Sequence, residues 1–246
     1  MKLYGSLTSP YVRKVRIVLK EKGLAHDLVV EGPADAAGNV ARLNPLRAIP
    51  LLERDDGEVF FDSPMICEYI DSLNDKPRLY PASGEARWQA LRWQALGQGM
   101  LEATVARMME GRKPAEKQDS SVIAKHEARI AAALAFAAAR VPPTAMDGGS
   151  AEREAVPPGT NAGAVFPPTA MDGGSAENAG AVFPPNGFIS GNSLGIADIA
   201  LGTALGYLDL RYVHDWRGRY PKLANWFAPI GQRPSFVETL APELKK

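Results

Sequence analysis

Strand-like segments are confined to the start of this 246-residue chain. Four short apolar runs lie before residue 62, and beyond residue 85 apolar side chains recur almost entirely at helical spacing. Such a chain can build one small sheet at its start and must bury the rest as packed helices. The pattern predicts an α/β unit over residues 1–74, a turn-rich linker over 75–84 and an all-helical part over 85–246.

The order of elements in the first part predicts a mixed sheet. A strand at 2–6 leads into a helix that starts at Ser9-Pro10 and ends at Gly23, and a second strand follows at 27–31. A β-α-β crossover joins parallel strands, whereas a turn between the runs 50–53 and 59–61 indicates an antiparallel hairpin.

Further helices follow from the apolar spacing. One is expected to start at Ser63-Pro64, with an inner face made of Ile66, Tyr69, Ile70 and Leu73. Four more are expected in the helical part, at 85–109, 122–140, 196–210 and 220–230. The segment 196–210 is apolar nearly all round, which is typical of a buried central helix.

Residues 141–185 interrupt the helical part. They contain 8 prolines and 7 glycines and no Leu, Ile, Trp or Tyr, so they cannot bury enough apolar surface to offset their ordering entropy. PPTAMDGGSAE occurs at 142–152 and again at 167–177, and NAGAVFPP occurs at 161–168 and 178–185. We interpret the segment as a duplicated low-complexity insertion between two helices, or as an artefact of sequence assignment.

Composition excludes several classes of protein. Lys and Arg total 28, as do Asp and Glu, so a formal net charge of zero offers no general attraction to nucleic acid or anionic lipid. No apolar run approaches the length of a membrane span, and the first residues lack the apolar stretch of a signal peptide.

The single cysteine, Cys67, excludes an internal disulfide and fits a reducing cytoplasm; we expect it to be a buried structural thiol. Three scattered histidines predict no metal site.

Ser9 is the first candidate for chemistry. It stands where a strand ends and a helix begins, so its hydroxyl lies among free backbone N–H groups at the positive end of a helix dipole. A ligand thiol held there would lose its proton more easily. The alternative is that Ser9 only caps the helix.

Two further positions could bind a ligand. A cis bond at Ile49-Pro50 would turn the backbone of Ile49 outward toward a peptide-like ligand, whereas an ordinary trans proline is far more common. At the second Ser-Pro helix, free N–H groups and the Ser63 hydroxyl would bind a carboxylate, and Asp62 would bind an ammonium group. A plain helix cap is again the alternative.

Arg13 and Arg16 have two interpretations. They contact the ligand or a partner subunit, or they lie on a solvated helix face.

Taken together, these features resemble a cytosolic-type glutathione S-transferase of the bacterial kind with a serine active site. The resemblance covers nearly the whole chain outside 141–185. It rests on 9–16 (SPYVRKVR) for the first strand–helix junction, 44–50 (NPLRAIP) for the approach to a cis-proline, 61–69 (FDSPMICEY) for the acid-Ser helix start and 196–200 (IADIA) for a buried helix with a structural aspartate. It implies a thioredoxin-like domain, a mixed four-stranded sheet with helices, followed by an all-α helical-bundle domain.

The resemblance also implies roles for particular residues. Ser9 would hydrogen-bond the glutathione sulfur, Ile49 would pair its backbone with the cysteinyl unit, and Pro50 would be cis. Asp62 and Ser63 would bind the γ-glutamyl end. The family often places a basic or amide residue just before the cis-proline dipeptide to hold the glycyl carboxylate. Here Ala48 stands at that position, and Arg47, one residue earlier, is counted among the candidate contacts.

We therefore expect a cytoplasmic, homodimeric detoxification enzyme that activates the thiol of glutathione, its co-substrate, for attack on an electrophilic small molecule. It would need no metal and bind no nucleic acid or membrane. The alternatives are a non-catalytic glutathione-binding or regulatory module of the same fold, or another glutathione-dependent enzyme such as an isomerase or dehalogenase.

Overall fold

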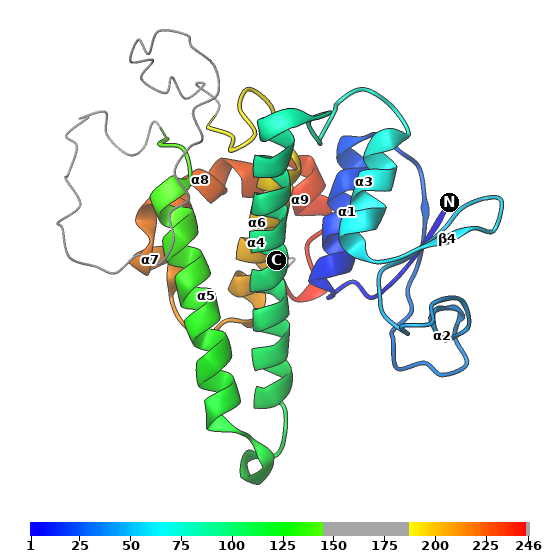
Figure 1. The fold of residues 1–246 in the computed structure, drawn as a ribbon. Coiled ribbons are helices and arrows are strands. Elements are labelled where there is room, and N and C mark those ends of the chain that lie inside the picture. Colours follow the sequence, from blue (N-terminus) through cyan, green and yellow to red (C-terminus); the bar gives the residue numbers. More distant parts are fainter. Residues whose placement is uncertain (145–186, 245–246) are drawn as a thin grey trace, which may run out of the picture.

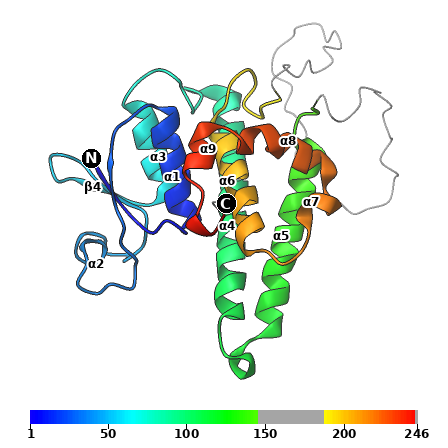
Figure 2. The ribbon, with the colours of Figure 1, turned by 180° about the vertical axis from the view of Figure 1, so that it is seen from behind.

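The computed structural model describes residues 1–144 and 187–244. Most of the repeated insertion predicted at 141–185 lies outside these described residues. An α/β layer stands beside a group of helices in which α4 and α5 run antiparallel (Figure 1), and the reverse view brings α8 and α9 to the front (Figure 2). The predicted fold class, a mixed sheet with helices followed by a helical domain, is confirmed.

The sheet has the predicted mixed topology. Its strands are β1 (Lys2–Tyr4), β2 (Asp27–Val29), β3 (Leu51–Glu53) and β4 (Val59–Phe60). They lie in the order β2-β1-β3-β4, with β1 parallel to β2 and β3 antiparallel to both of its neighbours. Each strand is one or two residues shorter than predicted. In β1, β2 and β4 the chain leaves the ladder early at the end of the strand, and β3 begins only after Pro50, which has no N–H group to donate.

The predicted long helices are all present. They are α1 (Pro10–Glu21), α3 (Ser63–Ser72), α4 (Gly84–Gly111), α5 (Ser120–Arg140), α6 (Ile196–Arg211) and α8 (Pro221–Gly231). The sequence patterns missed α2 (Asn39–Leu43), α7 (Trp216–Arg219), α9 (Pro234–Glu238) and the 3-10 turns Ala115–Lys117 and Pro242–Leu244. Elements of three to five residues are too short to establish a helical period.

The predicted inner face of α3 was wrong at one residue. Ile66 and Ile70 are fully buried as predicted, but Leu73 is 41% exposed because it follows the last helical turn. Cys67 is buried on that face instead, and burial raises the pKa of its thiol to about 12. The prediction that Cys67 is a buried thiol is thus confirmed.

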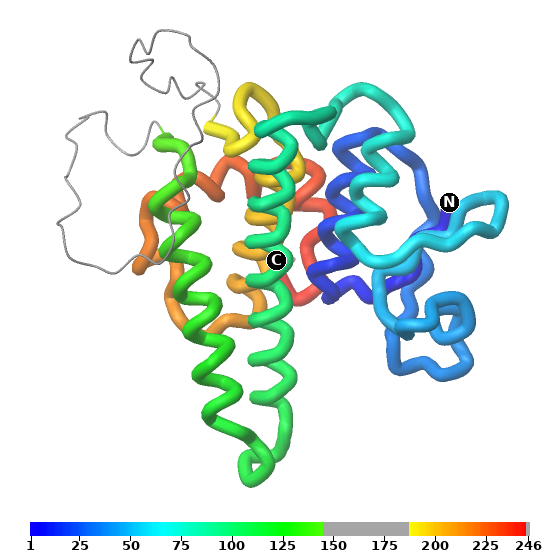
Figure 3. Tube along the Cα trace, in the orientation of Figure 1, coloured from blue at the N-terminus to red at the C-terminus, as the bar shows by residue number. Residues whose placement is uncertain are grey.

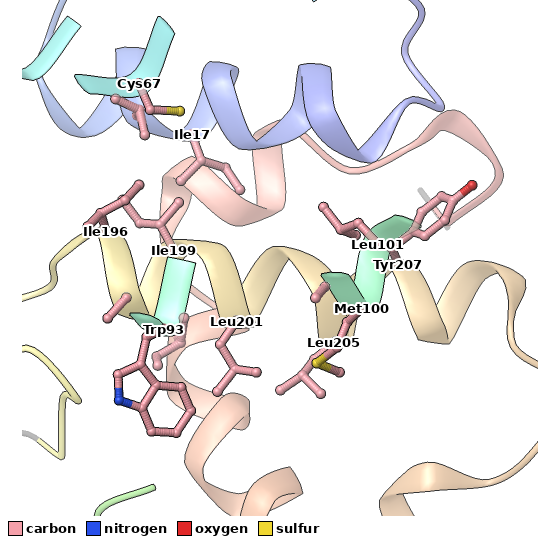
Figure 4. Packing of buried hydrophobic residues seen from close by; sticks show 14 of the residues in the cluster. Ile17, Cys67, Trp93, Met100, Leu101, Ile196, Ile199, Leu201, Leu205 and Tyr207 are labelled. Atoms are coloured by element: carbon pink, nitrogen blue, oxygen red, sulfur yellow. The ribbon is translucent and has the colours of Figure 1, made fainter. Parts of the chain in front are cut away.

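Helix α1 packs against both parts of the molecule. It contacts α3 beside the sheet, and it also contacts α6 and α9 of the helical part. Figure 4 shows Ile17 of α1 extending toward Ile196 and Ile199 of α6, with Cys67 of α3 nearby. The sheet-side core and the helical core therefore form one continuous apolar cluster.

The segment between the two parts is fastened to α1 and α3. The buried ammonium of Lys22 donates to Asp71 Oδ1 at 2.9 Å and to the carbonyls of Asn74 and Pro77 at 2.7 Å each. Asp71 in turn accepts from the backbone N–H groups of residues 79 and 80. The path of this segment is visible in the tube trace (Figure 3). The predicted limits of the linker, 75–84, stay a prediction.

The buried aspartate of α6 has the structural role implied by the resemblance. Asp198 accepts from the backbone N–H of Ile189 at 2.6 Å and of Gly195 at 3.0 Å. Gly195 stands where a capping hydroxyl residue would be expected, and a Cβ there would lie 2.3 Å from Ser190 Oγ. Glycine is therefore required by the close approach of Ser190.

A charged cluster also joins α1 to α9. Arg233 donates to both carboxylate oxygens of Glu21, at 3.0 and 2.9 Å, and Ser235 Oγ donates to the same carboxylate at 2.5 Å. Burial alone would raise the pKa of Glu21, but the hydrogen bonds from Arg233 and Ser235 outweigh it and hold the pKa below its usual value. The ionised carboxylate therefore stabilises the folded protein at neutral pH.

Glu21→Gln should lower the free energy of unfolding by about 1 kcal/mol at pH 7. The folded-state pKa of Glu21 lies below its unfolded value, so its contribution is present above the unfolded pKa and is lost as the pH falls through the folded pKa. The difference between variant and wild type should shrink as the pH falls below about 4 in urea unfolding curves. Glu238→Gln, which removes the exposed partner of Lys20 on the same pair of helices, is the control and should cost less than about 0.5 kcal/mol. A deficit that does not depend on pH would contradict the assignment.

Candidate functional site

The register of the sheet brings the three candidate segments together. Tyr4 at the end of β1 pairs with Leu51 at the start of β3, and Leu52 pairs with Phe60 at the end of β4. Because β3 is antiparallel to both neighbours, its first residues lie beside the last residues of β1 and β4. The junction at Ser9, the dipeptide Ile49-Pro50 and the start of α3 therefore share one edge of the α/β layer.

Ser9 is the N-cap of α1. Its backbone is extended, and its Oγ accepts a long hydrogen bond of 3.4 Å from Val12 N. A serine hydroxyl can accept and donate at the same time, so capping leaves the O–H available to a ligand. The first turn of α1 contains no acidic residue, so no side chain there offsets its positive end. The two interpretations of Ser9 are thus compatible.

The Ile49–Pro50 peptide bond is cis, as the resemblance implies. Ile49 is half-buried and precedes β3, so its backbone amide and carbonyl lie outside the strand ladder. Arg47 and Ala48 before it are exposed, and Arg47 has a positive φ of 49°. The edge of the loop is accordingly open to solvent next to the Ile49 backbone.

Sequence reasoning missed the residue that holds this loop. Asn44 is buried, its Nδ2 donates to the Ala48 carbonyl at 2.8 Å, and its Oδ1 accepts from Leu46 N at 3.0 Å. These bonds tie the start of the loop to the residue just before Ile49. The Asn-Pro pair at 44–45 is a turn signal that could have indicated this role.

Ser63 and Asp62 differ in their surroundings. Ser63 is the first residue of α3 and is 1% exposed, yet its Oγ has no hydrogen-bond partner among the described residues. Asp62 is exposed and occupies the N-cap position without making a side-chain capping bond. Buried hydroxyl groups are rarely unpaired in native proteins, so this hydroxyl is free to bond a ligand or a water molecule. The plain-cap alternative is not supported for either side chain.

Tyr11 is a second residue that the sequence did not single out. It lies in the first turn of α1 and is half-buried. Burial raises the pKa of its hydroxyl, with further contributions from Glu102 of α4, Tyr207 of α6 and Asp62. Its neighbours come from both parts of the molecule, so Tyr11 lies where the candidate site meets the helical domain. No local pattern could have shown this.

Arg13 and Lys14, the basic residues that come after Tyr11 in α1, do not lie on a solvated face. Arg13 is 7% exposed, and its Nη2 donates to the Phe236 carbonyl at 3.1 Å. Lys14 is fully buried and donates to Gln98 Oε1 at 2.9 Å, and burial lowers the pKa of its ammonium group. The solvated-face interpretation was therefore wrong for Arg13, because α9 and α6 cover this side of α1.

Two features are absent from the described residues. No helix there is long and apolar enough to cross a membrane. Nor do the side chains placed by the structure include a cluster of three or more His, Cys, Asp or Glu residues suited to a metal ion.

Comparisons with known proteins agree with this geometry. The family description "Glutathione S-transferase, N-terminal domain" matches residues 3–78, and "Glutathione S-transferase, C-terminal domain" matches residues 120–228. A crystal structure of a glutathione S-transferase from Methylobacillus flagellatus KT with GSH bound is 34% identical, with a TM-score of 0.75, and the alignment covers 97% of this chain and 98% of that one.

Two other relatives are similar over nearly their whole length. A glutathione S-transferase from Methylobacterium radiotolerans JCM 2831, in complex with glutathione sulfonate, is 28% identical with a TM-score of 0.75, covering 97% of this chain and 93% of that one. The uncharacterized GST-like protein YibF of Escherichia coli K12 is 28% identical over 99% of this chain and 100% of that protein. An α/β layer followed by a helical domain defines this class of protein. The chain belongs to the glutathione S-transferase family.

Proposed function

We propose that the protein is a glutathione transferase that activates the thiol of glutathione for attack on an electrophilic small molecule. The observation that carries the proposal is the buried Oγ of Ser63, which has no hydrogen-bond partner in the part of the chain that the structure describes and lies at the same edge as Ser9 and the Ile49 backbone. Three groups suited to different parts of one peptide-like ligand converge there. Relatives solved with glutathione and glutathione sulfonate support the choice of ligand.

The binding groups match the ends of glutathione. Ser63 O–H and backbone N–H groups at the start of α3 would donate to the γ-glutamyl carboxylate, and the exposed carboxylate of Asp62 would pair with its ammonium group. The Ile49 backbone would pair with the cysteinyl unit. Arg47, exposed beside Ala48, is the candidate for the glycyl carboxylate.

The chemistry centres on the sulfur. The Ser9 O–H would donate to the thiolate, and the N-terminus of α1 would add a favourable field, so both lower the pKa of the bound thiol. The thiolate would then attack the electrophile and form a carbon–sulfur bond. In a substitution the leaving group would take the electron pair, and in an addition to a carbonyl compound the carbonyl oxygen would take it. Tyr11 lies on the side toward the helical domain, where the electrophile would approach.

Removing the Ser9 hydroxyl should reduce turnover more than glutathione affinity, because its hydrogen bond strengthens as the thiolate forms. Ser9→Ala should lower kcat by about tenfold or more, and Ser9→Gly should do the same with little loss of helix stability, since glycine is a tolerable N-cap. Ultraviolet difference spectra of bound glutathione should lose the thiolate band at neutral pH in both variants. Ser6→Ala in the same loop is the control. Unchanged turnover and an unchanged thiolate band in both Ser9 variants would refute the role.

Ser63→Ala should weaken glutathione binding by about tenfold while leaving stability within about 0.5 kcal/mol, because the hydroxyl has no hydrogen-bond partner among the described residues. Calorimetric titration of glutathione and urea unfolding measure the two effects. Ser72→Ala, at the exposed end of the same helix, should leave affinity unchanged. Wild-type affinity in Ser63→Ala would contradict a glutathione contact.

We further propose that the protein is a homodimer in the cytoplasm. Met65 of α3 and Trp88 of α4 are 42% and 65% exposed, and Met65 and Leu91 line one groove between these helices. Exposed aromatic and methionine side chains are typical of protein interfaces. A second copy of the chain would cover this face.

Trp88→Glu should convert the dimer to a monomer at micromolar concentration, because the interface would have to bury a charge without a partner. Size-exclusion chromatography with light scattering measures the change in mass. Val213→Glu places the same charge at another exposed apolar side chain, which follows α6 and does not line this groove, and should leave the dimer intact. A wild-type protein that runs as a monomer would contradict the proposal.

A further inference from the structure

Helices α4 and α6 run parallel and end close together beside Tyr11. Gly97 of α4 lies against Ala200 of α6, since a Cβ on the glycine would be 2.7 Å from the Ala200 carbonyl oxygen. Farther along both helices, the Tyr207 hydroxyl donates to Met108 Sδ at 3.7 Å. Tyr207 also contributes to the electrostatic surroundings of Tyr11. The ends of both helices therefore lie on the side of Tyr11 from which the proposed electrophile would approach.

The Tyr207 hydroxyl points out of the apolar core. Only 5% of Tyr207 is exposed, but Figure 4 shows its oxygen directed away from Leu101 and Leu205. The thioether of Met108 is a weak acceptor, so the hydroxyl can exchange this bond for a stronger one with a ligand. Tyr11, Tyr207 and Met108 therefore supply apolar surface and two hydroxyl groups at this position.

Two arginines stand one helical turn beyond this contact. Arg112 is the C-cap of α4, four residues after Met108, and its backbone N–H donates to the Met108 carbonyl at 3.1 Å. Arg211 is the last residue of α6, four residues after Tyr207. Residues four apart share one face of a helix, so both guanidinium groups lie near the Tyr207 hydroxyl. Burial raises the pKa of that hydroxyl, and the positive charges of Arg211 and Arg112 oppose the rise.

The two guanidinium groups have donors to spare. Arg211 Nη2 donates to Glu243 at 3.2 Å, but Arg211 Nε is buried and has no hydrogen-bond partner among the described residues. Arg112 is exposed and forms no salt bridge with a residue that the structure describes. One carboxylate therefore faces two guanidinium groups, which leaves room for a second anion.

The local charge changes sign between the glutathione side and the helix ends. Glu102 of α4 and Asp62 at the start of α3 are the acidic side chains that act on Tyr11. Glu102 precedes Arg112 by ten residues, which is about 15 Å along the helix axis. A substrate with an anionic group would accordingly place that group at the helix ends and its other end toward the glutathione sulfur.

We propose that the electrophilic substrate carries a carboxylate, which binds Arg211 and Arg112 at the ends of α6 and α4. Its apolar body would lie against Tyr11, Tyr207 and Met108, with the reacting carbon toward the glutathione sulfur. This inference rests on the proposed transferase function and names the class of substrate, which that function leaves open.

Two electrophiles that differ in charge test the substrate class: 4-chloro-3,5-dinitrobenzoate and 4-chloro-3,5-dinitrobenzamide. With either compound the glutathione thiolate forms a bond to the ring carbon that carries chlorine. The carbon–chlorine bond breaks, chloride leaves with its electron pair, and the thiol proton passes to solvent. After correction for the uncatalysed rates, kcat/KM of the wild type should be about tenfold or more higher for the benzoate.

Substitutions of the two arginines should remove this preference. Arg211→Met and Arg112→Met should each lower kcat/KM for the benzoate several-fold more than for the benzamide, by about fivefold or more. Arg211→Lys keeps the positive charge and should retain most of the preference. A basic residue at a helix C-terminus also offsets the helix dipole, so circular dichroism measures any loss of folding separately. Arg129→Met makes the same change at an exposed position of α5 and should leave the preference unchanged.

Glu243→Gln tests the same site with the opposite sign. The Glu243 carboxylate competes for Arg211, so its removal should raise kcat/KM for the benzoate by about twofold or more without a matching rise for the benzamide. A purely structural role of Arg211 predicts no such gain.

Binding is measured as well, so that the transferase function and the carboxylate site can fail separately. Calorimetry compares the glutathione conjugates of the two compounds, whose binding requires no turnover. Equal kcat/KM for both compounds, in the wild type and in the folded arginine variants, would overturn the carboxylate site and leave the transferase function standing. Absence of turnover, together with tighter binding of the benzoate conjugate that Arg211→Met abolishes, would refute the transferase function and support the carboxylate site. Equal binding of both conjugates, or of neither, in a protein without turnover would overturn both.

Discussion

The arrangement of this protein depends on a single helix that has almost no free surface. Helix α1 is buried by the sheet and α3 on one side and by α6 and α9 on the other. Its apolar residues join the two cores into one cluster, and Glu21 near its end binds Arg233 of α9. A helix enclosed in this way cannot shift without disturbing both parts, so its N-terminus is held in place relative to the sheet. Precise placement of that N-terminus is what a site built around Ser9 requires.

The site itself follows from the antiparallel placement of β3. Its start lies beside the ends of β1 and β4, so residues far apart in the chain meet at one edge. Each contributes a different group. Ser9 supplies a hydroxyl at the start of one helix, Ile49 supplies its backbone, and Ser63 supplies a buried hydroxyl at the start of a second helix. Asn44 keeps the middle segment in position through the Ala48 carbonyl.

Local patterns predicted the elements well because the relevant forces are local. Ser9 before Pro10 and Gly23 after the helix mark the limits of α1, and the capping bond and the positive φ of Gly23 agree with this. Leu73 was wrongly predicted to be buried, because apolar periodicity alone does not show where neighbouring elements cease to cover a helix. A solvated helix face was one of the alternatives for Arg13 because a charged residue on a helix is usually exposed. The helices that cover it lie more than 180 residues later in the chain.

The mixed sheet, the long helices and the motifs that resemble the glutathione S-transferase family were predictable from the sequence alone, since capping, turn formation and apolar spacing depend on neighbouring residues. The packed structure was needed to show that Ser63 Oγ is buried without a described partner, that Tyr11 faces the helical domain and that Arg13 lies in a cavity. Burial and hydrogen bonding of these side chains are set by segments distant in the chain. Their environment follows from how α1 packs against those segments, and no short stretch of sequence contains that information.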